Sequence, residues 1–181
     1  MRTLFLALNL ACLAIAACKD KGNSNNGVGG TEADSEDSSS HAGDPCTAGS
    51  DPTLRLGFGA LEYRDLDPSG EDVAELIHGP QGGFHIDMAL AATGLDPALP
   101  WTVDLEGTID GEVMGQTRPL ATMRCNRSQN ELQTWGLLLI WDATPEELHD
   151  QVTDVVATAI DSAGTELSAT GTVRIWDPSL E

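Results

Sequence analysis

Positive charge is scarce in this chain, and the shortage excludes several classes of partner. Only 9 of the 181 residues are lysine or arginine, against 29 aspartates and glutamates, so the formal net charge at pH 7 is −20. From residue 45 onward the sequence contains no lysine. Such an acidic surface repels phosphate backbones and anionic lipid headgroups. We therefore expect no nucleic-acid partner and no membrane contact through a basic patch.

Recognisable enzyme motifs are also missing. The sequence has no Gly-x-Ser-x-Gly elbow, no His-Glu-x-x-His zinc motif, no phosphate-binding loop and no Cys-x-x-Cys pair. Acidic residues are so frequent that their proximity in sequence is no evidence for a paired general acid and base. We therefore predict no catalytic residues and a protein that is not an enzyme. A hydrolase of unrecognised type is the enzymatic alternative.

Cysteine is rare, with four residues in the whole chain. Cys12 and Cys18 lie in the N-terminal segment, which leaves Cys46 and Cys125. An even pair in an oxidising compartment indicates a disulfide, and two free thiols are the alternative. A bridge closing a loop of about 80 residues would stabilise the fold by roughly 4 kcal/mol through chain entropy.

No apolar run is long enough to cross a bilayer. After Arg2, apolar residues dominate from residue 3 to residue 17, whereas a membrane-spanning helix needs roughly 20 such residues. A basic start, a short apolar stretch and small residues before a cleavage site are typical of a secretory signal peptide. We expect residues 1–17 to be such a peptide and the protein to be exported.

The end of this segment, Ile15-Ala16-Ala17-Cys18, resembles the lipobox of bacterial lipoproteins. The resemblance implies that Cys18 carries diacylglyceryl and acyl chains such as palmitate. These chains would anchor the protein in a lipid bilayer, either the cell membrane or the outer membrane. Two alternatives remain: an ordinary signal peptide that leaves Cys18 unmodified, and Cys12 as the lipidated residue, although Asn9 fits the lipobox poorly.

Residues 18–44 are expected to form a flexible linker after the anchor. They are rich in glycine, serine and acidic residues, and Val28 is their only large apolar residue. Such a segment cannot bury enough surface to offset the entropy lost on ordering. We expect it to act as a spacer between the bilayer and a single domain over residues 45–181.

The domain shows the hydrophobic period of two residues that is typical of strands with one buried face. This pattern predicts strands at 54–58, 84–92, 101–109 and 167–175. Residues 132–141 are apolar in both alternating sets, which predicts a central strand covered on both faces, and 152–160 is similar. Asp110-Gly111 predicts a type I′ hairpin, and Thr144-Pro145 predicts a short helix ending near residue 150. Seven to nine short antiparallel strands indicate an all-β sandwich.

Residues 152–176 read as strand, Asp-Ser-Ala-Gly turn and strand, and they resemble the C-terminal hairpin of bacterial immunoglobulin-like domains. The resemblance implies an immunoglobulin-like β-sandwich. The chain departs from antibody-type domains because Cys46 precedes the first clear strand and Met123 stands where a tyrosine would precede the second cysteine. A Cys46–Cys125 bridge should therefore fasten the N-terminal end to a loop. The whole chain is similar to uncharacterised bacterial lipoproteins with such a domain, which implies no activity.

An acidic turn is the best candidate for a cation site. Its alternating oxygen-bearing side chains, followed by a glycine at the sixth position, resemble the start of a calcium-binding loop. The candidate ligands are Asp65, Asp67, Ser69, Glu71 and Asp72. Leu76 stands where the bidentate glutamate of such a loop belongs, so the sequence favours a solvated turn between two strands. We therefore predict no cofactor, with Ca²⁺ at this turn as the alternative.

The glycine-rich segment 79–83 is the second candidate site, because it lies between histidines. The residues that could bind a ligand or a transition metal there are His78, Gln81, His85 and Asp87. We expect His85 and Asp87 to share one strand face, with His78 able to join them. The spacing matches no known metal motif, so the sequence favours a tight crossover with a solvent-exposed His85.

These observations together predict a non-catalytic cell-envelope lipoprotein that presents a β-sandwich for binding or structural contact. Its partner would be an unidentified protein or glycan. The alternative is a calcium- or carbohydrate-dependent adhesion module. Four tryptophans could offer a sugar platform, but the alternation places Trp101 and at least one of Trp135 and Trp141 in the core, and only Trp176 on an exposed face.

Overall fold

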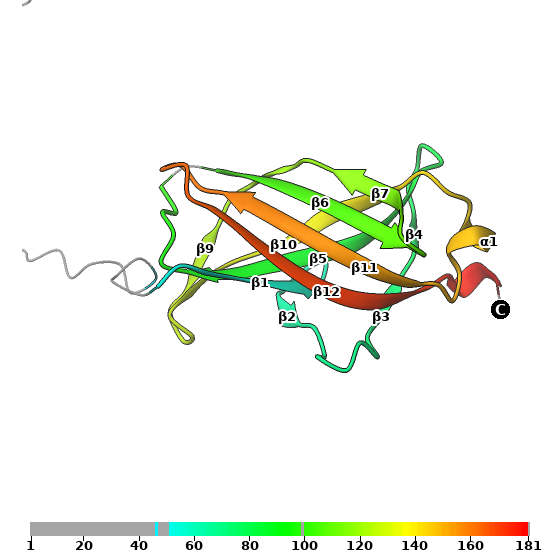
Figure 1. Cartoon of the computed structure of the whole chain (residues 1–181), viewed down its shortest axis with the longest axis horizontal. Coiled ribbons are helices and arrows are strands. Elements are labelled where there is room, and N and C mark those ends of the chain that lie inside the picture. The colour runs from blue at the N-terminus through cyan, green and yellow to red at the C-terminus, as the bar shows by residue number, and fades with distance from the viewer. Residues whose placement is uncertain (1–45, 47–50, 99, 181) are drawn as a thin grey trace, which may run out of the picture. The chain divides into compact units, whose positions relative to one another are not determined.

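A computed structural model describes residues 46, 51–98 and 100–180, and this part of the chain forms an all-β domain (Figure 1). Its strands are β1 (Thr53–Phe58), β2 (Arg64–Asp65), β3 (Val73–Glu75), β4 (Ile77–His78), β5 (Phe84–Thr93), β6 (Trp101–Ile109), β7 (Glu112–Thr117), β8 (Leu120–Ala121), β9 (Arg124–Asn126), β10 (Glu131–Trp141), β11 (Val152–Ile160) and β12 (Glu166–Trp176). Its helical elements are α1 (Pro145–Leu148) and the 3₁₀ turn η1 (Pro178–Leu180). The expected signal peptide, lipidated Cys18 and linker lie outside the described residues.

The strands form one hydrogen-bonded sheet that folds into two layers, as predicted for a sandwich. One layer is β1, β5 and β10 with the short strands β2, β4 and β9, and the other is β7, β6, β11 and β12 with β8 and β3. The only ladder pair between β10 and β7 is Trp141 with Gly115, so the fold line lies there. One apolar core, with members such as Met88, Leu105 and Val155, fills the space between the layers.

Alternation is regular in the layer that contains β6 and β11. Every odd-numbered residue of β6, from Trp101 to Ile109, is buried, and every even-numbered one is partly exposed. β11 alternates in the same way, which contradicts the expectation that both of its faces are covered. Its outward side chains, such as Asp154 and Val156, simply include apolar as well as polar residues, and sequence hydrophobicity cannot distinguish an exposed valine from a buried one.

The strand covered on both faces is β5 rather than the whole of β10. Met88–Ala92 is buried without alternation. Ala89 lies between Gly57 and Trp135, and Ala91 lies between Arg55 and Gln133. The larger of these neighbours, Trp135 beside Ala89 and Arg55 and Gln133 beside Ala91, account for the burial of the small alanines.

β10 is buried on both faces only over its first four residues, Glu131–Thr134. A β-bulge follows, with Gly136 at φ 68°. Beyond the bulge Leu138 and Ile140 are 41% and 45% exposed, because none of the described elements covers the outer face there. The prediction of a fully covered strand at 132–141 was therefore right only for its beginning.

One strand pairing is parallel, which corrects the expectation of purely antiparallel strands. β3 pairs with the end of β12 through Val73 opposite Arg174 and Glu75 opposite Trp176. This short pairing, like those of β2, β4, β8 and β9, involves two or three residues, too few for a period of two to be recognised. The structure therefore has more and shorter strands than the sequence predicted.

The predicted turns are present where their residues require them. Asp110 and Gly111 have φ of 52° and 84°, as a type I′ hairpin needs. The Asp161–Gly164 turn joins β11 to β12, so the predicted C-terminal hairpin is confirmed. Helix α1 begins at Pro145 as predicted, and Glu147 accepts a hydrogen bond from the Thr144 amide at 2.9 Å.

Candidate functional site

A groove of about 630 Å³ lies between the edge of β1, the edge of β12 and the turn that follows β2. We call it the seam groove, because it follows the line where the sandwich stays open between the two layers. Its lining comprises 54–56 of β1, 65–70 of the turn, Val152, and 169–172 of β12. It therefore contains three of the five predicted calcium ligands: Asp65, Asp67 and Ser69.

The turn lining the groove uses its carboxylates to organise its own backbone. Asp67 Oδ1 accepts a hydrogen bond from the Ser69 amide at 2.8 Å, and Asp72 accepts one from the Asp67 amide. The hydrogen bonds from Ser69 lower the pKa of Asp67, so it is charged at neutral pH. Glu71 is exposed beside them. This is the geometry of a turn stabilised by aspartate side chains.

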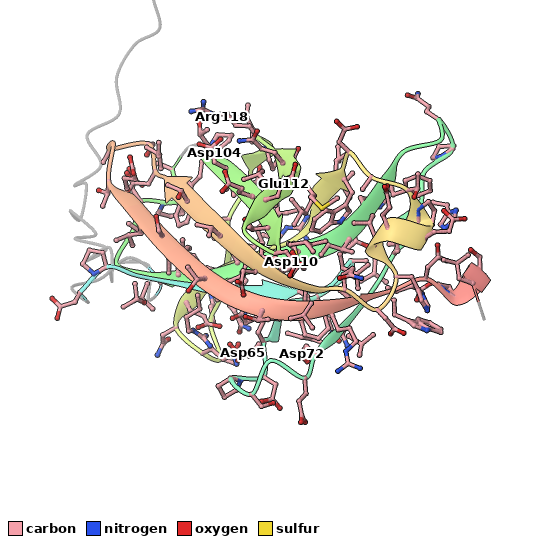
Figure 2. All side chains as sticks on the ribbon, turned by 45° about the vertical axis from the view of Figure 1, so that its right-hand side comes forward. Asp65, Asp72, Asp104, Asp110, Glu112 and Arg118 are labelled. Atoms are coloured by element: carbon pink, nitrogen blue, oxygen red, sulfur yellow. A yellow bond between two sulfur atoms is a disulfide. The ribbon has the colours of Figure 1, made fainter. Side chains whose placement is uncertain are left out.

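Asp65 points toward another partner, the guanidinium of Arg55 on β1. Arg55 pairs with Asp65 and, at 2.5 Å, with Glu131 of β10, whose side chain is only 8% exposed. The Tyr63 hydroxyl donates to Asp65 at 2.6 Å. Burial, and then the hydrogen bond to Asp65, raise the pKa of Tyr63 well above its usual value. Asp65 and Asp72 lie together on the β2–β3 side of the domain, away from Asp104 and Arg118 (Figure 2).

The structure does not gather the predicted acidic residues around one point. Within the described residues, no group of three or more histidine, cysteine, aspartate or glutamate side chains is placed to hold a metal ion. Asp65 faces Arg55, whereas Asp67 and Asp72 face the turn backbone. Three of the five predicted calcium ligands, Asp65, Asp67 and Asp72, thus already accept hydrogen bonds from the protein.

The histidines flanking the glycine-rich turn lie on opposite faces of the β4–β5 pair. His78 is opposite Phe84 and contacts its ring edge-on, with centroids 5.0 Å apart, whereas His85 is opposite Ile77. His85 and Asp87 share the outer face, as predicted, but His78 does not join them. Gln81 is exposed at the tip of the turn.

His78 instead contacts a carboxylate that was not among the predicted site residues. Its Nε2 donates to Oδ2 of Asp177 at 2.8 Å, and Asp177 is fully buried just after β12. The Asp177 amide donates to Nδ1 of His149 at 3.1 Å, and the Ser179 amide donates to Asp177 Oδ1. Burial raises the pKa of Asp177, but the hydrogen bonds from Ser179 and His78 outweigh this effect and hold it below its usual value.

The Cys46–Cys125 disulfide is present and lies at the opposite end of the strands from His78. Its Cα atoms are 5.7 Å apart and it spans 79 residues of sequence. Cys125 belongs to β9 and pairs with Leu132, so the bridge is attached to a strand rather than to the loop we expected. That strand consists of only three consecutive residues, which is too short for an alternating pattern to be recognised in the sequence.

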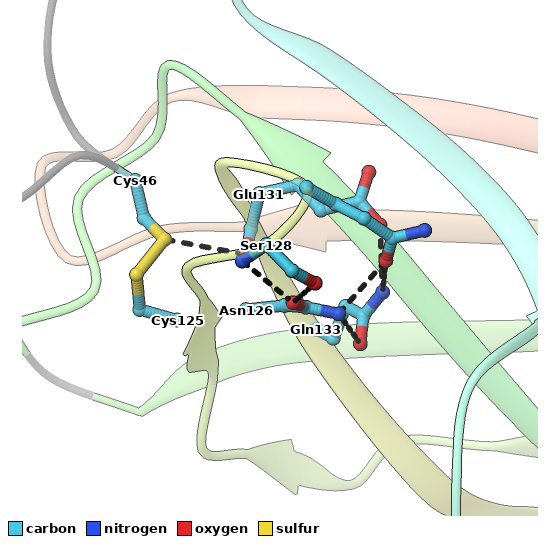
Figure 3. The surroundings of a disulfide bond; sticks show 7 residues. Cys46, Cys125, Asn126, Ser128, Glu131 and Gln133 are labelled. Carbon is cyan, nitrogen blue, oxygen red and sulfur yellow. Dashed lines mark hydrogen bonds between the residues drawn. A yellow bond between two sulfur atoms is a disulfide. The ribbon is translucent and has the colours of Figure 1, made fainter.

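A cluster of polar side chains lies beside the disulfide (Figure 3). The side-chain amide of Gln133 donates to the Glu131 carboxylate at 2.6 Å and to the side-chain oxygen of Gln129 at 2.9 Å. The side-chain amide of Asn126 donates to the side-chain oxygen of Gln133 at 3.1 Å. Glu131 links this network to Arg55 and hence to the seam groove. The sequence feature that could have indicated this network is the pair Glu131 and Gln133 at the start of a mostly apolar strand.

Three of the four tryptophans are placed as the alternation predicted. Trp101 and Trp141 are buried, and Trp176 is partly exposed. Trp135 lies on the outer face under Arg124, whose guanidinium carbon is 4.9 Å from the ring centroid. The two outward tryptophans, Trp135 of β10 and Trp176 of β12, belong to different layers and therefore do not form one flat platform.

Comparison of the sequence with protein-family models and with curated proteins finds no match. In the part of the chain that the structure describes, no helix has the length and apolar character needed to traverse a bilayer. The fold, the disulfide and the seam groove therefore carry the functional argument.

Proposed function

We propose that this protein is a lipid-anchored, non-catalytic protein of the bacterial cell envelope, whose immunoglobulin-like β-sandwich is held away from the bilayer on a flexible linker. The domain binds a partner or makes structural contacts. Its anchor is the diacylglyceryl and acyl modification of Cys18, and it needs no cofactor.

The Cys46–Cys125 disulfide is the observation that carries this proposal. Structural disulfides persist in oxidising compartments and are rare in reducing ones. The bridge therefore supports export, and export in turn supports the interpretation of residues 1–17 as a signal peptide. Cys18 directly follows that peptide and lies 28 positions before Cys46, which leaves a spacer long enough to lift the domain from the membrane.

Membrane fractionation of a Cys18→Ala variant tests the proposal. The wild-type protein should fractionate with membranes, and intact-mass spectrometry should show acyl chains on its N-terminal cysteine. The variant should be released, whereas a matched Cys12→Ala variant should stay membrane-bound. A Cys18→Ala protein that still fractionates with membranes would refute the lipid anchor.

A further inference from the structure

Two strand edges face the seam groove without a strand partner. β1 pairs with β5 along its whole length but with β2 only at Gly57 and Phe58. β12 pairs with β11 over most of its length but with β3 only from Arg174 onward. Among the described residues, 53–56 and 166–173 therefore have no strand on their groove side.

The ladder pattern shows which backbone groups point into the groove. The Gly59 amide donates to Asp87 of β5, so odd-numbered residues of β1 bond to β5, and Leu54 and Leu56 point their N–H and C=O groups the other way. The Arg174 amide donates to Asp72 beside β3. By the same alternation Ser168, Thr170 and Thr172 present their backbone groups to the groove.

The floor of the groove is apolar. Leu56 is buried, Leu54 and Ala169 are partly buried, and all three line the cavity. At one end the Leu66 side chain lies over Gly171, at a position where any Cβ on residue 171 would overlap it. The chain thus already places one apolar side chain of its own on this floor, between the two strands.

The charge at the groove mouth favours a cationic occupant. Arg55 is the only cation among the described lining residues, and Asp65 and Glu131 already neutralise it. Asp67 is an exposed carboxylate on the rim. An acidic segment would be repelled both by this rim and by the domain as a whole, whereas a lysine or arginine would be attracted.

We propose that the seam groove binds an extended peptide segment by strand addition, with small apolar side chains on the floor and basic side chains at the rim. The proposal deepens the binding role proposed above and rests on it. Strand addition gains affinity from main-chain hydrogen bonds and specificity from alternate side chains. The free length of β1 suits a segment of about four to six residues.

A defined probe tests this proposal with the full chain purified in detergent. The probe is the capped peptide valine-lysine-valine-lysine-valine, and its binding is followed by calorimetry and by amide hydrogen exchange. We expect a Kd below about 1 mM. We also expect slower exchange of the Thr170 and Leu54 amides, with the Gly171 amide, which bonds to β11, as an unchanged internal reference.

Thr170→Pro removes a donor that faces the groove while leaving the β11 ladder intact, so it should weaken binding by about tenfold or more. Thr170→Val, which keeps the backbone amide, should bind more tightly than Thr170→Pro, so the difference between the two variants reports the loss of this donor. The same peptide with glutamate in place of lysine should bind at least about tenfold more weakly. If Thr170→Pro does not fold, hydrogen exchange in the wild-type protein tests the proposal by itself, through protection of the Thr170 amide when the peptide is added.

No binding at 1 mM, or binding without protection of Thr170, would overturn the proposal. Protection of Thr170 without peptide, together with a concentration-dependent dimer in light scattering, would assign the groove to a second copy of this chain. A protein that is lipidated and membrane-bound but binds no probe would refute only the peptide groove. Loss of the anchor with retained probe binding would refute only the envelope location.

Discussion

The two ends of the sandwich are fastened by different chemistry. At the disulfide end, a covalent bridge joins Cys46 to Cys125, and the Glu131–Gln133 network lies beside it. At the histidine end, the buried Asp177 is held by His78 and Ser179 and itself bonds to His149. One end thus depends on redox state and the other on protonation.

This difference explains why one end was predictable and the other was not. Four cysteines in a chain are conspicuous, and pairing them is a matter of counting. Asp177 is one of 29 acidic residues, and nothing in its neighbourhood sets it apart. The sequence alone does not show which of these carboxylates the fold will bury, so the role of Asp177 could not be predicted.

Removing the disulfide should have the largest effect. Replacing Cys46 and Cys125 together by serine should lower the free energy of unfolding by about 4 kcal/mol, because the unfolded chain gains the entropy of an open loop. Urea denaturation measures the loss. Adding reductant should destabilise the wild type similarly but leave the double variant unaffected, and an unchanged wild-type midpoint would contradict the prediction.

Asp177→Ala should weaken the histidine end by about 2–3 kcal/mol, because the Ser179 amide and His78 lose their acceptor in a buried site. Urea denaturation again provides the measurement. Asp177→Asn keeps one oxygen and should cost less. Equal stability of the alanine variant and the wild type would show that the fold does not need this carboxylate.

Arg55→Ala should cost about 2 kcal/mol, because it leaves the nearly buried Glu131 without its cation. The effect should be smaller than that of losing Asp177, since half-exposed Arg55 is partly screened by water. Arg55→Ala combined with Glu131→Gln should recover part of the loss. A double variant no more stable than the single one would indicate that the pair is not coupled.

Acid should weaken the histidine end through Asp177. Because the folded-state pKa of Asp177 lies below its usual value, its contribution is fully present above about pH 4 and is lost as pH falls through the lower folded value. Asp177→Asn should therefore flatten the fall of stability below pH 4. Asp161, whose pKa is also lowered, contributes in the same pH range and is present in both proteins. If the stability of Asp177→Asn falls below pH 4 as steeply as that of the wild type, the acid sensitivity does not come from Asp177.

Calcium should have the smallest effect. The oxygens of Asp65, Asp67 and Asp72 already accept hydrogen bonds from the protein, so adding calcium or a chelator should move Tm by less than about 1 °C. Differential scanning calorimetry with magnesium as control measures the shift. A larger calcium-specific rise would favour the adhesion-module alternative.

The sequence predicted the long strands well because each spans four or more alternations. The limits of β6 match the predicted 101–109, and β5 and β11 differ by at most one residue. It failed on the outer face of the β1–β5–β10 layer. Hydrophobicity alone could not show that Ala89 and Ala91 are covered by neighbouring side chains, or that Leu138 and Ile140 are exposed.

The candidate site was predicted only in part, for a physical reason. The turn containing Asp65 and Asp67 was recognised from its residue types, but its partner Arg55 lies ten positions earlier than Asp65 and Glu131 lies on a distant strand. The groove itself is made of backbone edges. Whether an edge is free depends on which strands pair, and residue types carry little of that information.

The position of β12 between β11 and β3 constrains how the domain is made. β3 has no parallel neighbour until the last strand has been synthesised, so the layer stays unfinished until nearly the whole chain is present. Long-range pairings of this kind form slowly. Under the export that we propose, the chain would therefore still be unfolded while it is threaded through a narrow translocation channel, and folding would finish on the far side, where the Cys46–Cys125 disulfide can form.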